Sequence, residues 1–222
     1  MRRVPEPLRV AGDELEMPTE RRLILAAERL FAERGIDAVS LRAVNAAAGT
    51  NVASANYHFG TKAALVEALV RERSGEVSAR RATLLDALEA AGPPDVRGLA
   101  EAFVAPVAEM ALSDGDTWVR FIAGIVGTRH PALTVVTDAF TDQALRFTAL
   151  LEQICPEAPR ETVRFRLAQA MNLTFRVLGD VGGTQDTLAL SGVALSPQQV
   201  VDQLLDVVTS ILAGPPASGR RA

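Results

Sequence analysis

The segment TNVASANYHFGTKAAL, residues 50–65, places several polar side chains close together, among them Asn51, Ser54, Asn56, Tyr57 and His58. Amide and hydroxyl groups bind the edges of DNA bases, and a phenol or an imidazole can bind a phosphate oxygen. Only one strongly charged residue, Lys62, follows before the chain becomes apolar. A polar run this short is usually a loop, and a helix here would need a surface to contact.

The charge pattern around this segment points the same way. Residues 38–66 contain no Asp or Glu but do contain Arg42 and Lys62, although the whole chain has a net charge of −4. A surface that faces phosphate needs a local absence of acid more than a basic total. The alternative is an Ala-rich packed segment in which acids would be buried.

Start and stop signals predict four helices around the polar segment. They are 19–35 with Thr19 as N-cap and Gly35 as C-cap, 41–48 with Ser40 as N-cap, 52–58 with Asn51 as N-cap, and a long helix after Thr61 that runs to about Ala91. Helices 41–48 and 52–58 are too short to be stable alone, so they must pack on each other and on the first helix. This is the layout of a helix-turn-helix unit, whose second helix lies in the DNA major groove.

The segment 24–69 resembles the DNA-binding domain of the tetracycline-repressor (TetR) family of bacterial transcription regulators. The resemblance rests on ILAAERLFAERGIDAVSLRAVNAAAG followed by NYHFGTKAAL, with the Ala48–Gly49 turn and Lys62 at the family spacing. The family pattern usually has Tyr where Asn56 stands and Val where Thr50 stands, and NYHF is a recurring sub-pattern. The resemblance implies an all-α fold, a double-stranded DNA partner and a homodimer.

The residues expected to bind DNA are Ser40, Arg42, Asn51, Val52, Ala53, Ser54, Asn56, Tyr57, His58 and Lys62. Residues 51–54 line the start of the recognition helix, where base contacts usually lie, and Lys62 with nearby backbone N–H groups could hold a phosphate. Arg42 could instead be a solvated surface residue, Tyr57 a core residue, and His58 a capping or packing residue.

The remaining chain predicts an all-α regulatory domain with helices at about 95–113, 117–128, 131–154, 159–180 and 197–212. The Gly- and Thr-rich segment 181–195 is expected to be a mobile loop. We therefore expect a flexible arm at 1–18, a DNA-binding domain at 19–66, a regulatory and dimerisation domain at 67–213, and a disordered tail at 214–222.

The apolar stripes of 159–180 and 197–212 could pair with their symmetry mates in a homodimer, as the resemblance implies, or form intrachain core. A small-molecule cavity is expected among Phe103, Trp118, Phe121, Phe140, Asn172 and Arg176. The aromatic residues would line it, and Asn172 or Arg176 would meet a polar group of the ligand. For Trp118, core packing is the alternative.

These observations predict a cytoplasmic, dimeric repressor that binds a palindromic operator and is released by a small, largely hydrophobic effector. The alternative is a DNA-binding regulator controlled by a partner protein, or one without a small-molecule inducer. An enzyme has little support, because two His residues and one Cys give no catalytic or metal-ligand arrangement. No cofactor is expected, and no apolar run is long enough to span a membrane.

Overall fold

The structure is a computed structural model, and it describes residues 17–215. These residues form eleven α-helices and no strand, so the predicted all-α fold is confirmed. The chain divides into two compact units, the first ending at Glu72 and the second beginning at Arg73. The sequence puts this boundary after residue 66, and both positions fall inside the long helix α4 (Lys62–Ala90). The expected arm lies largely, and the expected tail partly, outside the described residues.

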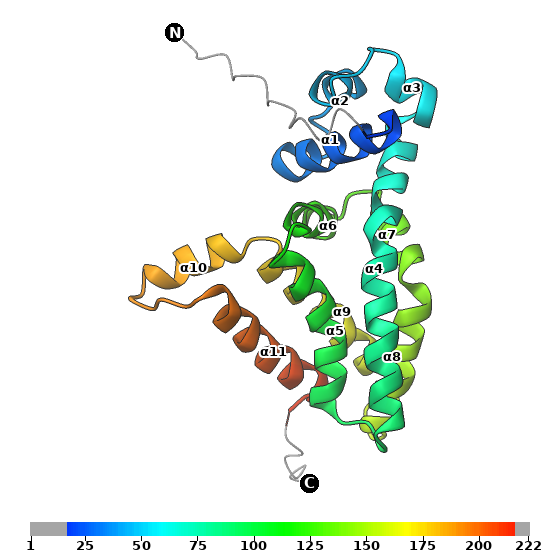
Figure 1. The fold of residues 1–222 in the computed structure, drawn as a ribbon. Helices are drawn as coiled ribbons and strands as arrows, with labels where there is room; N and C mark the ends of the chain where they lie inside the picture. Colours follow the sequence, from blue (N-terminus) through cyan, green and yellow to red (C-terminus); the bar gives the residue numbers. More distant parts are fainter. Residues whose placement is uncertain (1–16, 216–222) are drawn as a thin grey trace. The chain divides into compact units, whose positions relative to one another are not determined.

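The first unit contains three helices and the start of α4. They are α1 (Thr19–Arg34), α2 (Leu41–Ala47) and α3 (Ser54–Phe59) (Figure 1). Each of the three packs on the other two. Their shared core consists of fully or almost fully buried apolar side chains, among them Leu23, Ala27, Leu30, Phe31, Val44, Ala55, Leu65 and Leu69. The two short helices are therefore stabilised by packing rather than by their own length.

The helix ends of the first unit largely follow the predicted signals. The Ser40 hydroxyl accepts a hydrogen bond from the Ala43 amide at 3.2 Å, and the Thr61 hydroxyl accepts one from Ala64 at 3.1 Å. Gly60 has φ +72° directly after α3, a conformation that favours glycine. Thr19 is the first helical residue rather than the N-cap, because Pro18 occupies the N-cap position in an extended conformation.

The recognition helix begins later than the sequence indicates. Asn51 is not its N-cap; its side-chain oxygen accepts a hydrogen bond from the Ala53 amide at 3.1 Å and so forms a turn before α3. Asn side chains commonly make such local turns in competition with helix. Val52 and Ala53 consequently lie in the turn, whereas Ser54 opens the helix.

The second unit contains the rest of α4 and seven further helices. They are α5 (Val96–Ala111), α6 (Asp116–Thr128), α7 (Leu133–Ala139), α8 (Thr141–Ile154), α9 (Arg160–Leu178), α10 (Val181–Ala189) and α11 (Pro197–Ala213). Helix α9 packs against α5, α6, α8 and α11, and it is thus the central helix of the unit. In Figure 1, α8 lies along the second half of α4, with α5 beside them.

Two predicted elements of the second unit differ from the structure. The helix expected at 131–154 is two helices, because the chain leaves helical geometry at Phe140 (φ −118°, ψ 10°). The segment expected to be a mobile loop, 181–195, contains α10, whose N-cap Asp180 accepts a hydrogen bond from Gly183 at 2.9 Å. Two glycines in its first turn conceal this helix from a propensity argument.

None of the helices within residues 17–215 is both long and apolar enough to cross a membrane.

Candidate nucleic-acid interface and effector cavity

One buried amide, Asn45 of α2, joins the two helices of the helix-turn-helix. Its side-chain nitrogen donates to the Val52 carbonyl at 2.7 Å, and its side-chain oxygen accepts from the Ala55 amide at 2.9 Å and from the Thr50 hydroxyl at 3.1 Å. The residue is 1% exposed. Buried polar groups need partners, and here the partners come from the turn and from α3. Asn45 therefore fixes how α3 is presented.

Arg22 of α1 holds the other side of the turn. Its guanidinium donates to the carbonyl of Ala48 at 2.6 Å and to that of Gly49 at 2.8 Å. Carbonyl groups at a helix C-terminus lack partners inside the helix, and a cation is favourable there. Gly49 itself has φ +60°, which lets the chain turn sharply between α2 and α3.

The exposed face of α3 and of the turn before it carries most of the residues expected to bind DNA. Ala55 is fully buried against the unit, whereas Asn51, Ala53, Asn56 and His58 are exposed. Tyr57 is 86% exposed and Val52 is 66% exposed. Ser54 is half-buried. An exposed phenol and an exposed isopropyl group, on a segment free of carboxylates, are compatible with a surface that binds a DNA groove.

Ser40 and Arg42 lie at the start of α2, and both are exposed. The Ser40 hydroxyl already accepts the capping bond from Ala43, and its proton remains free to be donated. Arg42 projects from the first turn of α2, where the helix dipole disfavours a cation unless an anion is near. The position is compatible with the phosphate contact expected from the sequence.

Lys62 has a role inside the first unit that the sequence did not indicate. Its ammonium donates to the carbonyls of Ile36 at 2.9 Å and Val39 at 3.2 Å, in the segment between α1 and α2. An ammonium has three N–H donors, so one remains for a phosphate. Lys62 therefore stabilises the domain as well as being a candidate DNA contact.

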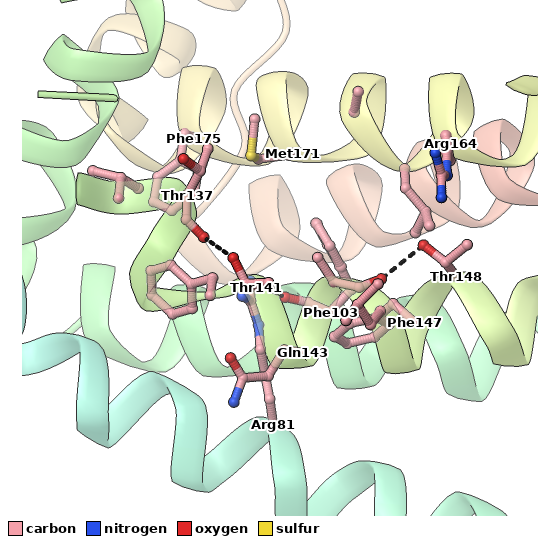
Figure 2. Close-up of a pocket in the computed structure, with 16 residues that line it drawn as sticks. Arg81, Phe103, Thr137, Thr141, Gln143, Phe147, Thr148, Arg164, Met171 and Phe175 are labelled. Atoms are coloured by element: carbon pink, nitrogen blue, oxygen red, sulfur yellow. Dashed lines mark hydrogen bonds between the residues drawn. The ribbon is translucent and has the colours of Figure 1, made fainter. Parts of the chain in front are cut away.

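The second unit contains a cavity of about 420 Å³ between α8 and α9, with α4, α5 and α7 contributing to its wall (Figure 2). Phe103 and Phe140 line it, as expected from the sequence. The other wall residues are mainly apolar or small, and they come chiefly from α8 and α9: Ala144, Leu145, Phe147, Thr148, Leu167, Ala168, Met171 and Phe175. Such a cavity suits a largely hydrophobic molecule.

A buried cation, Arg81 of α4, also belongs to this cavity wall. Its side chain reaches from α4 toward α8, and its guanidinium carbon lies 4.8, 5.3 and 5.9 Å from the ring centres of Phe103, Phe140 and Phe147. One nitrogen donates to the Phe103 carbonyl at 3.1 Å. Burial lowers the pKa of Arg81 to about 10, so the group stays charged at neutral pH.

Two family models match this chain. The model described as bacterial regulatory proteins of the tetR family matches residues 23–69, and a tetracyclin repressor-like C-terminal domain matches residues 101–210. The chain belongs to the TetR family of transcriptional regulators. Its helix-turn-helix is thus the DNA-binding domain of such a regulator, and α4 to α11 form the helical C-terminal part.

Solved structures show the same fold for proteins similar to this TetR-family chain. One is described as "Probable transcriptional regulatory protein RHA5900", with 22% identity, a TM-score of 0.59, and coverage of 88% of this chain and 100% of that one. The ketosteroid transcriptional regulator KstR2 of Mycobacterium tuberculosis has 20% identity, a TM-score of 0.54, and coverage of 90% and 95%. A TetR-family regulator from Streptomyces coelicolor, SCO4454, has 18% identity, a TM-score of 0.53, and coverage of 87% and 94%. No protein of curated function matched the sequence.

Four residues expected to form the effector site of this TetR-family chain do not line the cavity. Trp118 and Phe121 are 0% and 2% exposed and belong to the core face of α6. Asn172 and Arg176 are exposed on the outer face of α9, while Met171 and Phe175 of the same helix face the cavity. For Trp118, the core alternative left open by the sequence is the one observed.

Arg81 is not among the cavity residues expected from the sequence, although the sequence contains a signal for it. Val77 and Leu85, four residues before and after it, are fully buried, so Arg81 occupies an apolar stripe of α4. A cation inside such a stripe is unusual enough to mark a site. The adjacent Arg80 conceals this signal, because two consecutive Arg residues suggest a solvated surface.

Proposed function

We propose that this TetR-family chain is a dimeric, ligand-responsive repressor that binds a palindromic operator and is released by a small, largely hydrophobic effector. The observation that carries the DNA part is the exposed, carboxylate-free face of α3, held on α2 by Asn45. The 420 Å³ cavity supports the effector part. Because DNA is its partner, we place its action in the cytoplasm.

In this proposal the exposed residues divide into two roles. Asn51, Val52 and Ser54 read base edges, since amides and hydroxyls bind bases and an isopropyl group contacts a thymine methyl. Arg42, Tyr57 and Lys62 hold phosphates and set the register. Ser40, Ala53, Asn56 and His58 complete the surface. Asn56 stands where the family commonly has Tyr, and its shorter amide would reach a phosphate only if the backbone of α3 comes closer.

The dimer would form through the outer faces of α9 and α11. Phe165 of α9 is 65% exposed and Val207 of α11 is 48% exposed, so each helix has an apolar group that its own unit leaves uncovered. The stripe of α11 expected to form the seam is instead largely intrachain, because Val200, Leu204 and Val208 are buried. Two recognition helices related by a two-fold axis would meet half-sites about 34–36 Å apart.

The effector would act through α4, which contributes Lys62 to the first unit and Arg81 to the second. A ligand shifts an equilibrium only by binding one conformation better than the other. We propose that a ligand in the cavity favours the conformation of α4 that does not fit the operator.

The decisive experiment is selection of bound duplexes from a random pool by the purified full chain. We expect enrichment of one inverted repeat, and Asn51→Ala or Ser54→Ala should change the enriched bases. Failure to enrich any inverted repeat would overturn the operator proposal. A metabolite screen against the resulting complex then separates an effector-released repressor from a regulator controlled by a partner protein.

A further inference from the structure

The cation of Arg81 is buried without an anion. The residue is 5% exposed, and among the residues that the structure describes no carboxylate pairs with it. Its Nε–H is also without a hydrogen-bond acceptor. The three phenylalanine rings and the Phe103 carbonyl stabilise the charge in part. Burying a charge is costly unless it is paired, so an anion bound in the cavity beside Arg81 would offset part of this cost.

Among the other polar groups of the cavity wall, three Thr hydroxyls already donate their hydrogen atoms within the protein, whereas the Gln143 amide still has N–H groups to donate. The Thr137 hydroxyl donates to a backbone carbonyl at 2.8 Å. The hydroxyls of Thr141 and Thr148 do the same at 2.9 and 2.7 Å (Figure 2). Gln143 uses its side-chain oxygen to accept from Ser78 at 3.4 Å, which leaves its amide N–H groups for a ligand. Among the lining residues, the hydrogen atoms left for a ligand are therefore those of Arg81, Gln143 and Arg164, and all three side chains bind acceptors.

The charge of the wall has one sign. The lining residues include Arg81 and Arg164 but no Asp or Glu. Arg164 is exposed on α9, where it attracts anions from solvent, whereas Arg81 is at the buried end. An electrostatic arrangement of this kind raises the local concentration of an anion and excludes cations.

We propose that the effector is an apolar molecule with a single acidic group, and that Arg81 binds this group while the aromatic and aliphatic wall of α8 and α9 covers the apolar body. This inference rests on the proposed effector site and assigns its chemical class. It replaces Asn172 and Arg176 as the anchor, because both are exposed outside the cavity. A charged hydrogen bond in a buried site supplies about tenfold to hundredfold in affinity.

Two fluorescent probes test this inference with the full chain. 1-Anilinonaphthalene-8-sulfonate and N-phenyl-1-naphthylamine have the same aromatic body, and only the first has an acidic group. We expect the wild-type protein to bind the sulfonate about tenfold or more tightly than the neutral probe. Arg81→Met, which keeps the length and apolar stem of the side chain, should remove this preference and leave the neutral probe bound within about threefold.

Three further variants control the measurement. Ala168→Phe fills the cavity from α9 and should weaken both probes if they bind there. Arg164→Gln removes the exposed cation and should retain most of the preference, since an exposed charge contributes little. Arg81→Lys keeps a charge at the site and should retain part of the preference. If circular dichroism shows that Arg81→Met does not fold, the test rests on Arg81→Lys and on the ratio of the two probe affinities in the wild-type protein.

The outcomes separate the inference from the function on which it rests. Equal binding of both probes by the wild type, or an unchanged preference in Arg81→Met, would overturn the acidic class while leaving a neutral effector in the same cavity. Binding of neither probe would overturn both the class and the effector site. The operator selection is unaffected by any of these results.

Discussion

At the scale of single residues, Asn45 and Arg81 are both buried polar groups, but they differ in how many of their hydrogen-bonding groups have partners. The Asn45 amide is satisfied by Val52, Thr50 and Ala55, all within the first unit. The Arg81 guanidinium has one hydrogen-bond acceptor within residues 17–215. Satisfied buried groups specify a structure, and an unsatisfied one indicates a ligand or strain.

Replacing Asn45 should destabilise the first unit more than any exposed residue of α3. Asn45→Leu has similar volume but leaves the Val52 carbonyl and the Ala55 amide without their partner. We expect a loss of about 2–4 kcal/mol in the free energy of unfolding. Urea denaturation of the full chain measures it, with Asn56→Leu as the exposed control within α3, which should change stability by about 0.5 kcal/mol or less. Equal losses in the two variants would contradict the role of Asn45.

Lys62 and Arg42 should behave differently, although both are candidate phosphate contacts. Arg42→Gln should weaken binding to all duplexes, make the salt dependence shallower by about one unit, and leave the melting midpoint unchanged. Lys62→Ala should weaken binding and also lower the midpoint, because it removes the hydrogen bonds to Ile36 and Val39. Salt titrations of DNA binding and thermal melts of the same samples separate these effects. A stable Lys62→Ala protein would show that the internal bonds contribute little.

The sequence predicted the exposed surface of α3 better than the cavity, for a physical reason. Residues 51–58 are neighbours along the chain, so the face that they expose follows from local geometry, in the turn at 51–53 and in the helix after it. The wall of the cavity joins α4, α5, α7, α8 and α9. Which of several aromatic residues faces it depends on tertiary packing. Phe103 and Phe140 could thus be found, whereas Trp118 could not be told apart from core.

At the scale of elements, the helix boundaries were predictable where a side chain caps the backbone. Ser40 and Thr61 do so, and the helices begin where the sequence indicates. The break between α7 and α8 has no Gly or Pro to announce it. It lies at Phe140, whose ring contacts the guanidinium of Arg81. Tertiary contact, rather than local propensity, explains this break.

The start of α11 gives an element-scale prediction. The Ser196 hydroxyl accepts from the Gln199 amide at 3.2 Å, and the Gln199 side chain accepts from the Ser196 amide at 2.8 Å, which together form a capping box. Ser196→Ala should therefore cost about 1 kcal/mol of unfolding free energy, measured by urea denaturation. Ser210→Ala, an exposed change within the same helix, should cost about 0.5 kcal/mol or less. If the two variants lose the same amount, the capping box has no measurable effect.

At the scale of the whole molecule, the proposed dimer depends on side chains that the single chain leaves uncovered. A two-fold axis makes the interface self-complementary, so each substitution enters it twice. Of the apolar residues of α11, Leu204 is 4% exposed and Val207 is 48% exposed. Only the second is free to contact another chain.

Val207→Glu and Leu204→Glu should therefore fail in different ways. Val207→Glu should give a folded protein with a weakened dimer, because a carboxylate in a desolvated interface lacks a partner. Leu204→Glu should unfold the second unit, since it introduces the same charge into intrachain core. Light scattering reports the mass, and circular dichroism reports the helix content. A Val207→Glu protein that stays fully dimeric would place the interface elsewhere, and Phe165→Glu then tests the outer face of α9.

Because the charge of Arg81 is unpaired, the melting midpoint of the protein should depend on which acidic compounds are in the solution as well as on the polypeptide. A compound that binds only the native state raises the free energy of unfolding by mass action, by about 2.7 kcal/mol at a hundred times its dissociation constant. Every compound that neutralises the guanidinium would therefore raise the melting midpoint in proportion to the logarithm of its concentration. Thermal scans of a compound library would then rank acids above their amides and esters without any knowledge of the operator. In Arg81→Met, acids should raise the melting midpoint no more than their amides and esters do.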